Sequence, residues 1–172
     1  MRFTTKIGNP RKIRTPRARM AILKRHPLDQ GNRYRIVLLD ACNVGYRYTR
    51  NGQFSSEGLR LALQYFADKN YEVYGLMPRF RLKPGKSMDP LLLERLYKSG
   101  RLILTPCKEF PQQAPCYDDR FLIDIAAKFD CAIISNDKFR DLMHEKPHYK
   151  DVIARRIPFE WDGDRFVILG NP

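Results

Sequence analysis

Residues 35–40 read RIVLLD, a short apolar run that ends in a carboxylate. A run of this kind is typical of a strand that is buried on both faces. Residues 55–69, SSEGLRLALQYFADK, follow with apolar side chains at helical spacing, and Ser55 or Ser56 is a suitable N-cap. These two segments predict the first strand and helix of an α/β domain.

The same alternation of strand and helix continues along the chain. We expect further strands at 72–78, 101–106 and 131–137, helices at 89–100, 117–129 and 138–145, loops at 79–88 and 108–116, and a final strand pair over 156–169. Alternating strands and helices imply a parallel sheet with helices on both faces. The predicted fold class is therefore α/β, a Rossmann-like three-layer parallel sheet.

The net charge of +13 is concentrated near the start of the sequence. The first 35 residues hold eleven Lys or Arg and one acid, whereas the other 137 hold 21 basic and 18 acidic residues. We expect a basic, flexible arm over 1–33 and a folded domain over 34–172, because the arm combines three prolines with little apolar periodicity. Such an arm attracts phosphate backbones; a solubilising tail and an organelle-targeting segment are the alternatives.

Several classes of protein are excluded by what the sequence lacks. It contains no apolar stretch of about 18 residues, so we expect no membrane span. Its four cysteines and three histidines do not have the spacing of a zinc site. We interpret the cysteines as reduced thiols, in keeping with a reducing compartment.

Four aspartates are expected at one edge of the sheet. Asp40 ends the first strand, Asp137 follows the fourth, and Asp118 and Asp119 begin the helix after the third. Ligands of open parallel sheets bind outside the carboxyl ends of the strands. Four carboxylates in one cleft repel unless a cation neutralises them, and Mg²⁺ prefers oxygen ligands. We therefore predict a Mg²⁺ site, with Mn²⁺ as the alternative ion.

Each aspartate also has a structural explanation. Asp118 and Asp119 complement the dipole of the helix that they begin. Asp40 can close a turn with Asn43, and Asp137 can cap the helix at 138–145. The coincidence of all four at one strand edge favours the metal site.

A basic loop accompanies the acidic edge. Arg79, Arg81, Lys83 and Lys86 lie between residues 79 and 86, and Phe80 stands between two arginines. Phe80 can stack on an unpaired base or pack beneath the loop. Because a metal ion activates water for attack on phosphate, an acidic cleft in basic surroundings predicts metal-dependent hydrolysis of nucleic acid.

Four segments of the sequence resemble the NYN (PIN-like) ribonuclease domain of the Regnase/MCPIP family, the CCCH zinc-finger ribonucleases. They are VLLDACN (37–43), GLRLALQYF (58–66), LTPCKEFPQQAPCYDDRFLIDIA (104–126) and IISNDKFRDL (133–142). CYDDRF followed by SNDKFRDL is the most specific part. Family members usually have Gly-Ser where this chain has Ala41 and Cys42.

The resemblance implies a Mg²⁺-dependent endoribonuclease that cleaves single-stranded RNA in RNA decay or silencing. Its catalytic, metal-binding tetrad falls on Asp40, Asp118, Asp119 and Asp137. Asn43 and Asn136 are then supporting polar groups, and Asp141 is an acid just outside the metal ligands. The implied RNA-binding residues are Arg79, Phe80, Arg81, Lys83, Arg120, Lys138 and Arg140.

The resemblance also bears on partners and location. It implies a homodimer formed through the NYN domain and protein partners that supply RNA targeting, since the family's zinc finger is not found in this sequence. We expect a cytoplasmic protein, in RNA granules among other places, with nucleus and mitochondrion as alternatives. A catalytically inactive RNA-binding or scaffold module of the same fold is the rival hypothesis, but four acids facing a polyanion argue against it.

Overall fold

A five-stranded parallel sheet forms the centre of the computed structural model, which describes residues 35–105 and 117–169. The strands are β1 (Ile36–Asp40), β2 (Glu72–Pro78), β3 (Leu102–Thr105), β4 (Ala132–Ile134) and β5 (Arg156–Ile157). Their order is β3-β2-β1-β4-β5, and every neighbouring pair is parallel. The chain thus builds outward from β1 in one direction and then in the other, so the topological switch point lies between β1 and β4.

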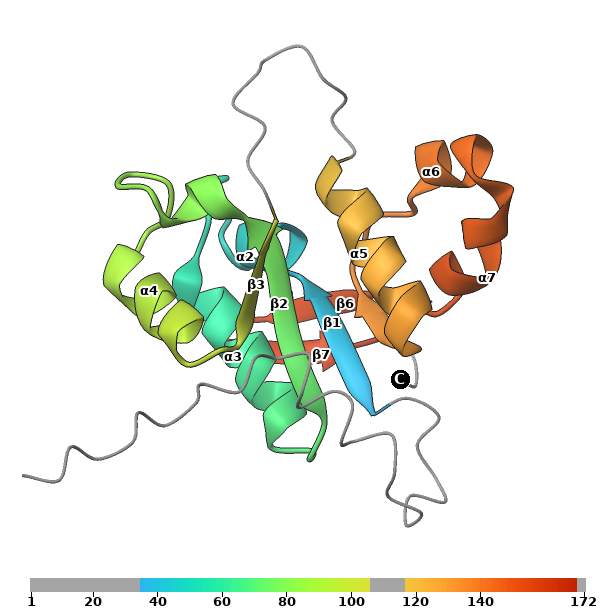
Figure 1. The fold of residues 1–172 in the computed structure, drawn as a ribbon. Helices are drawn as coiled ribbons and strands as arrows, with labels where there is room; N and C mark the ends of the chain where they lie inside the picture. Colours follow the sequence, from blue (N-terminus) through green and yellow to red (C-terminus); the bar gives the residue numbers. More distant parts are fainter. Residues whose placement is uncertain (1–34, 106–116, 170–172) are drawn as a thin grey trace, which may run out of the picture. The chain divides into compact units, whose positions relative to one another are not determined.

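Helices cover both faces of the sheet, which confirms the predicted three-layer α/β fold (Figure 1). They are α2 (Ala41–Tyr48), α3 (Ser56–Ala67), α4 (Pro90–Lys98), α5 (Tyr117–Phe129), α6 (Arg140–Glu145) and α7 (Lys150–Ile153). Val37 and Leu39 of β1 belong to the core under α3, whereas Leu38 belongs to the core under α5. This alternation follows from the two-residue period of a strand.

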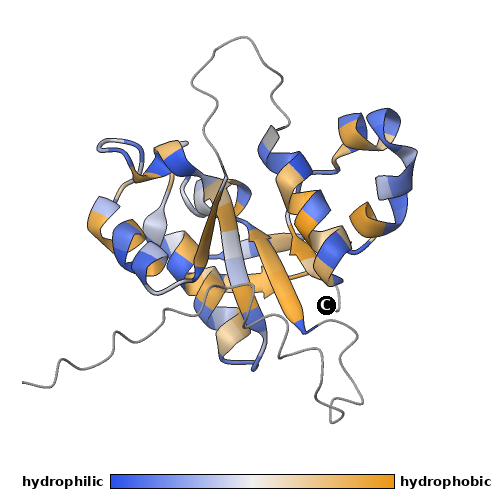
Figure 2. Cartoon of the chain, in the orientation of Figure 1, coloured by the Kyte–Doolittle hydropathy of each residue, from blue (hydrophilic) through white to orange (hydrophobic). Residues whose placement is uncertain are grey.

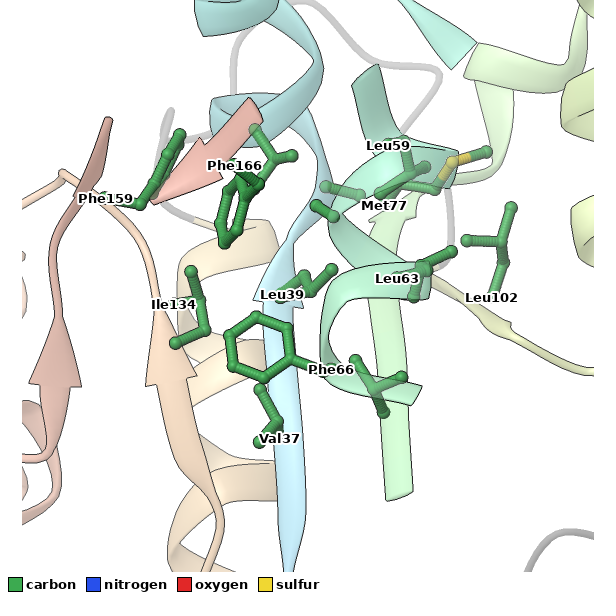
Figure 3. Packing of buried hydrophobic residues seen from close by; sticks show 14 of the residues in the cluster. Val37, Leu39, Leu59, Leu63, Phe66, Met77, Leu102, Ile134, Phe159 and Phe166 are labelled. Carbon is green, nitrogen blue, oxygen red and sulfur yellow. The ribbon is translucent and has the colours of Figure 1, made fainter. Parts of the chain in front are cut away.

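The core under α3 also receives the C-terminal hairpin. Figure 3 shows Phe66 of α3 beside Val37 and Leu39, and Phe159 beside Phe166. These two phenylalanines come from β6 (Phe159–Asp162) and β7 (Arg165–Ile168), which pair in antiparallel fashion, and their ring centroids lie 5.1 Å apart. Figure 2 shows β1 apolar along its length and the outer sides of α5 and α6 largely hydrophilic.

Most predicted elements are confirmed. The strand at 72–78 and the helix at 117–129 have the observed bounds, and the other predicted elements are up to three residues too long at an end. The predicted arm over 1–33 and the predicted loop at 108–116 lie outside the described residues. In the part of the chain that is described, no helix is long and apolar enough to cross a bilayer.

Four features of the fold differ from the prediction or were missed. The segment at 79–88 is not wholly a loop, because Arg79–Leu82 forms the 3₁₀ helix η1. The final strand pair is confirmed as β6 and β7, but it is shorter than predicted, because residues 156–157 form β5 in the main sheet. A second 3₁₀ helix, η2 (Pro147–Tyr149), leads into α7, and neither was predicted. Helix α2 was missed because its eight residues follow β1 without a loop.

Close contact between glycines and aromatic rings holds α2 against its neighbours. A Cβ atom on Gly58 of α3 would lie 2.5 Å from the Cβ of Tyr48, and one on Gly45 of α2 would lie 2.6 Å from Cε2 of Phe54. Only glycine permits these approaches. Since α2 begins at the end of β1, the same contacts position the first turn that follows Asp40.

We predict that Gly58→Ala destabilises the domain by about 1 kcal/mol or more. Alanine is the better helix former by up to about 1 kcal/mol, but overpacking against the Tyr48 Cβ, which is tied to the α2 backbone, typically costs about 1–3 kcal/mol. Urea unfolding followed by circular dichroism measures the change. A rise in the unfolding midpoint would show that α2 moves away without cost.

Candidate active site

The four predicted aspartates form one electrostatic cluster at the carboxyl ends of the strands, the upper side in Figure 1. Burial raises the pKa of Asp40 to about 6, and the charges of Asp137 and Asp118 add to the shift. Burial likewise raises the pKa of Asp119 to about 7, helped by the charges of the other three aspartates. The four carboxylates are thus close enough to influence one another's ionisation, and their role in catalysis and metal binding stays a prediction.

The register of β1 against β4 explains the position of Asp40. Leu39 pairs with Ile134, so the next residues along, Asp40 and Ser135, are neighbours. The hydroxyl of the buried Ser135 donates to Oδ2 of Asp40 at 2.8 Å, and the Asn43 N–H donates to Oδ1 at 3.1 Å. The predicted turn between Asp40 and Asn43 is thus the N-cap of α2. Both carboxylate oxygens are held, which fixes the orientation of the group.

A second hydroxyl, on Thr105, holds Asp118. Thr105 is the last residue of β3; it is buried, and its Oγ1 donates to Oδ1 of Asp118. Neither Thr105 nor Ser135 was predicted as a site residue. The only signal in the sequence is a hydroxyl residue at the end of an apolar run. Such a residue can be assigned to the site only when the strand or helix that carries its hydrogen-bond partner is known.

Asp137 fixes a strained turn and does not cap α6. Its Oδ1 accepts a hydrogen bond from the Phe139 N–H at 2.9 Å, and its own N–H donates to Ser135 Oγ at 3.1 Å. Phe139 has φ of 47°, a conformation that bulky residues rarely adopt, and its side chain is only 3% exposed. The helix begins after it, at Arg140, without a side-chain cap.

The two predicted asparagines hold segments of backbone together. Oδ1 of Asn43 accepts from the Asn136 N–H at 2.9 Å. The side-chain amide of Asn136 bonds both the N–H and the C=O of Phe159, each at 3.0 Å. These bonds tie α2, the turn after β4 and strand β6 to one another. Both residues support the site by positioning the segments that carry its carboxylates.

The other predicted charged residues are placed as follows. Asp141 is exposed in the first turn of α6 and is not among the charges that shift the pKa of Asp40 or Asp119. Arg120 forms an ion pair with Glu145, so a phosphate would have to compete with that carboxylate. The exposed residues of the set are Arg79 and Lys83 around η1, and Lys138 and Arg140 after β4. Their binding of RNA stays a prediction.

Arg81 is half-buried between aromatic rings. Its guanidinium carbon lies 4.7 Å from the ring centroid of Phe80 and 4.8 Å from that of Tyr46. Burial raises the pKa of the neighbouring Cys42 thiol to about 12, and Arg81 opposes this shift only in part. Without a metal ion, this shift favours the neutral form of the Cys42 thiol.

The carboxylate oxygens of the four aspartates are the type of ligand that Mg²⁺ prefers in proteins. Within residues 35–105 and 117–169, no three carboxylate, thiol or imidazole groups come close enough to hold one ion among them. Mg²⁺ keeps several waters and commonly uses only one or two carboxylates, so it does not need such a group. The raised pKa of Asp119 has only burial and the charges of the other three aspartates as its causes, and its role as a metal ligand stays a prediction.

The profile of a known family, described as the Zc3h12a-like Ribonuclease NYN domain, matches residues 33–172. The chain belongs to this family. The NYN domain is also 30% identical, over 143 residues, to the endoribonuclease rege-1 of Caenorhabditis elegans. That match covers 80% of this chain and 23% of the relative, so the chain spans about a quarter of that protein's length.

Two solved structures share the fold of this NYN domain. Both are of the nuclear proteinaceous RNase P 2 of Arabidopsis thaliana. One is a crystal structure with a TM-score of 0.60 and 20% identity, covering 81% of this chain and 30% of that one. The other has a TM-score of 0.56 and 20% identity, covering 78% and 29%. The resemblance recognised in the sequence is thereby confirmed for family and fold.

We predict that Asp119→Asn stabilises the metal-free domain at pH 8 but not at pH 4. A carboxyl whose pKa rises from 3.8 to about 7 on folding stabilises the folded state most below pH 4, and this contribution is lost as the pH rises to 7. The gain at pH 8 should be on the order of 1–2 kcal/mol after screening by solvent.

Chemical denaturation in EDTA across this pH range measures the effect. Asp141→Asn is the matched control, because it also removes a carboxylate from a first helical turn but one that is exposed. It should lower stability slightly at pH 8, by about 0.3–1 kcal/mol. Equal effects of the two substitutions would mean that Asp119 is only a helix-dipole partner.

Proposed function

We propose that this NYN domain is a metal-dependent endoribonuclease that cleaves single-stranded RNA and acts in RNA decay or silencing. The observation that carries the proposal is the cluster of four aspartates at the carboxyl ends of the strands, where Asp40 and Asp119 have raised pKa values. Such a cluster is costly to a metal-free fold. Its presence in a chain of a ribonuclease family is explained if it serves catalysis.

In this proposal the four aspartates have different roles. Asp119 together with one of the other three aspartates would hold Mg²⁺ or Mn²⁺, while the remaining carboxylates, held by hydrogen bonds, add negative charge. When bound, the ion lowers the pKa of a water and neutralises charge on the scissile phosphate. A carboxylate of the cluster that does not bind the ion would orient the attacking water and accept its proton.

The surrounding cations supply attraction for the RNA backbone. Arg79 and Lys83 follow β2, and Lys138 and Arg140 follow β4, so they lie at the same ends of the strands as the acids. Exposed Lys and Arg bind phosphates through salt-dependent charge interactions. The basic residues of 1–33, a second copy of the domain and targeting proteins would add to the affinity for RNA.

We predict that Asp119→Asn lowers the rate of cleavage of a 5′-labelled single-stranded RNA by at least about a hundredfold. Cleavage by the unaltered domain should need Mg²⁺ or Mn²⁺ and stop in EDTA. RNA affinity of the variant should be unchanged or higher, since a carboxylate that repels phosphate is gone. Gel-resolved cleavage and fluorescence anisotropy measure the two quantities.

The control for this experiment is Asp141→Asn, which should cleave at close to the normal rate. If the unaltered domain binds RNA but never cleaves it with either ion, the domain is a binding or scaffold module. If Asp141→Asn loses activity as completely as Asp119→Asn, Asp141 belongs to the catalytic group and our reading of its exposure is wrong.

We further predict that Mg²⁺ raises the melting temperature of the domain, and more so at pH 8 than at pH 5. The ion binds only the folded cluster, and its carboxylates are more fully ionised at the higher pH. Differential scanning fluorimetry with 0–20 mM Mg²⁺, about the range for a weak site, measures the shift. Asp119→Asn should lose most of it, and a shift that survives in this variant would place the ion elsewhere.

A further inference from the structure

A cavity of about 540 Å³ is lined in part by α2, the helix that follows Asp40, and none of the four aspartates is among its described lining residues. Its walls come from Tyr46 of α2, from Gln53 and Phe54 before α3, and from the segment between η1 and α4. Cavities of this size are typical of sites for small ligands or parts of larger ones. The proposed mechanism makes no use of it.

The walls of this cavity are well anchored. The Met88 N–H donates to the Phe54 C=O at 2.9 Å, which joins its two loops. The Phe54 ring rests on Gly45 of α2, and its centroid lies 5.8 Å from that of Tyr46 in an edge-to-face arrangement. A cavity built from fixed backbone and packed rings is a pre-formed site, which lowers the entropic cost of binding.

The lining combines aromatic rings, positive charge and unused hydrogen-bonding groups. Arg81 lies 4.8 Å from the Tyr46 ring centroid and 5.6 Å from that of Phe54, and Lys86 adds a second cation. Nε of Arg81 and Oγ of Ser87 are both buried and have no hydrogen-bond partner among the described residues. Buried polar groups are nearly always paired, so the Ser87 hydroxyl is available to a ligand or to water, whereas the Arg81 guanidinium already bonds the Cys42 thiol.

We propose that this cavity is a base pocket, which receives one unpaired nucleobase of the RNA strand. The base stacks against the half-buried Tyr46 ring and the guanidinium of Arg81, the kinds of surface on which proteins stack unpaired bases. Ser87 and Gln53 face its polar edge, and Lys86 meets the adjoining phosphate. Among the described residues, no carboxylate lines the cavity to repel that phosphate. The inference rests on RNA being the substrate of the neighbouring cluster.

Arg81 and α2 connect the base pocket to the acidic cluster. Arg81 also interacts with the thiol of Cys42, which in turn senses the charges of Asp40 and Asp118. Cys42 and Tyr46 are one helical turn apart on α2, a rise of about 6 Å. A base held in the pocket therefore fixes which phosphate of the strand reaches the carboxylates, and the pocket sets the nucleotide preference next to the cleavage site.

The test uses the cleavage-deficient Asp119→Asn protein and a set of single-stranded hexaribonucleotides. In each, 2-aminopurine, whose fluorescence changes on stacking, replaces one base. We expect one position to respond strongly on binding. Adding Ser87→Ala or Tyr46→Leu should weaken that response and lower affinity at least about fivefold, in line with the loss of one stacked or hydrogen-bonded base.

Tyr97→Leu is the matched control, since Tyr97 is an exposed tyrosine on α4 outside the cavity, and it should change neither quantity. Ser87→Ala removes one atom, so a folding defect is not expected to obscure its result. If Tyr46→Leu and Ser87→Ala behave like Tyr97→Leu, the base pocket is overturned.

A second measurement separates this inference from the proposed function. The protein with Asp119 intact is tested for cleavage of RNA that lacks the base at the responding position. We expect at least about a tenfold slower cleavage than of intact RNA, and Tyr46→Leu should cleave both equally slowly. If the missing base does not change the cleavage rate, the base pocket is contradicted but the ribonuclease activity is not. If 2-aminopurine responds in the pocket but no RNA is ever cleaved, the ribonuclease activity is contradicted and the base pocket is not.

Discussion

Leu39 of β1 pairs with Ile134 of β4, and the site depends on this register. It sets Asp40 beside Ser135, whose hydroxyl bonds both the Asp40 carboxylate and the Asp137 N–H. A shift by one residue would move every side chain of β1 to the opposite face. Leu38 would then leave the core under α5, so burial of the strand and orientation of the carboxylate are fixed by the same pairing.

Electrostatic repulsion among the four aspartates destabilises the folded state. Burial and mutual repulsion raise the pKa of Asp40 to about 6 and of Asp119 to about 7, so ionising them weakens the metal-free fold. The left-handed conformation of Phe139, next to Asp137, adds backbone strain at the same place. The packed cores on both faces of the sheet offset these costs, and local instability of this kind is common where a fold carries a function.

How far the sequence predicts the site depends on the range of each interaction. The strand before Asp40 and the helix start at Asp118 follow from local apolar patterns, and the rule for parallel sheets brings them to one edge. Thr105 and Ser135 escaped prediction because each matters through a partner more than ten residues away. The asparagine amides also bond across the chain, to backbone that no local pattern identifies.

The loop after β2 shows the same limit. Its charge was evident in the sequence and was interpreted as a set of RNA contacts, while Phe80 was expected either to stack on an unpaired base or to pack beneath the loop. In the structure Arg81 instead packs between rings from α2 and η1 and forms part of a cavity wall. The cavity wall forms because α2 packs against Phe54, and this packing needs glycine at position 45. The sequence of the loop alone gives no sign of this contact.

The most direct test of the central claim is the anomalous scattering of Mn²⁺ in crystals of the domain grown with that ion. The account predicts an anomalous peak at the carboxyl ends of β1 and β4, bonded to Asp119 and to at least one of Asp40, Asp118 and Asp137. The peak should vanish in crystals of Asp119→Asn. Crystals soaked in saturating Mn²⁺ with no peak at this edge would contradict the claim that the four carboxylates are kept together to bind a cation.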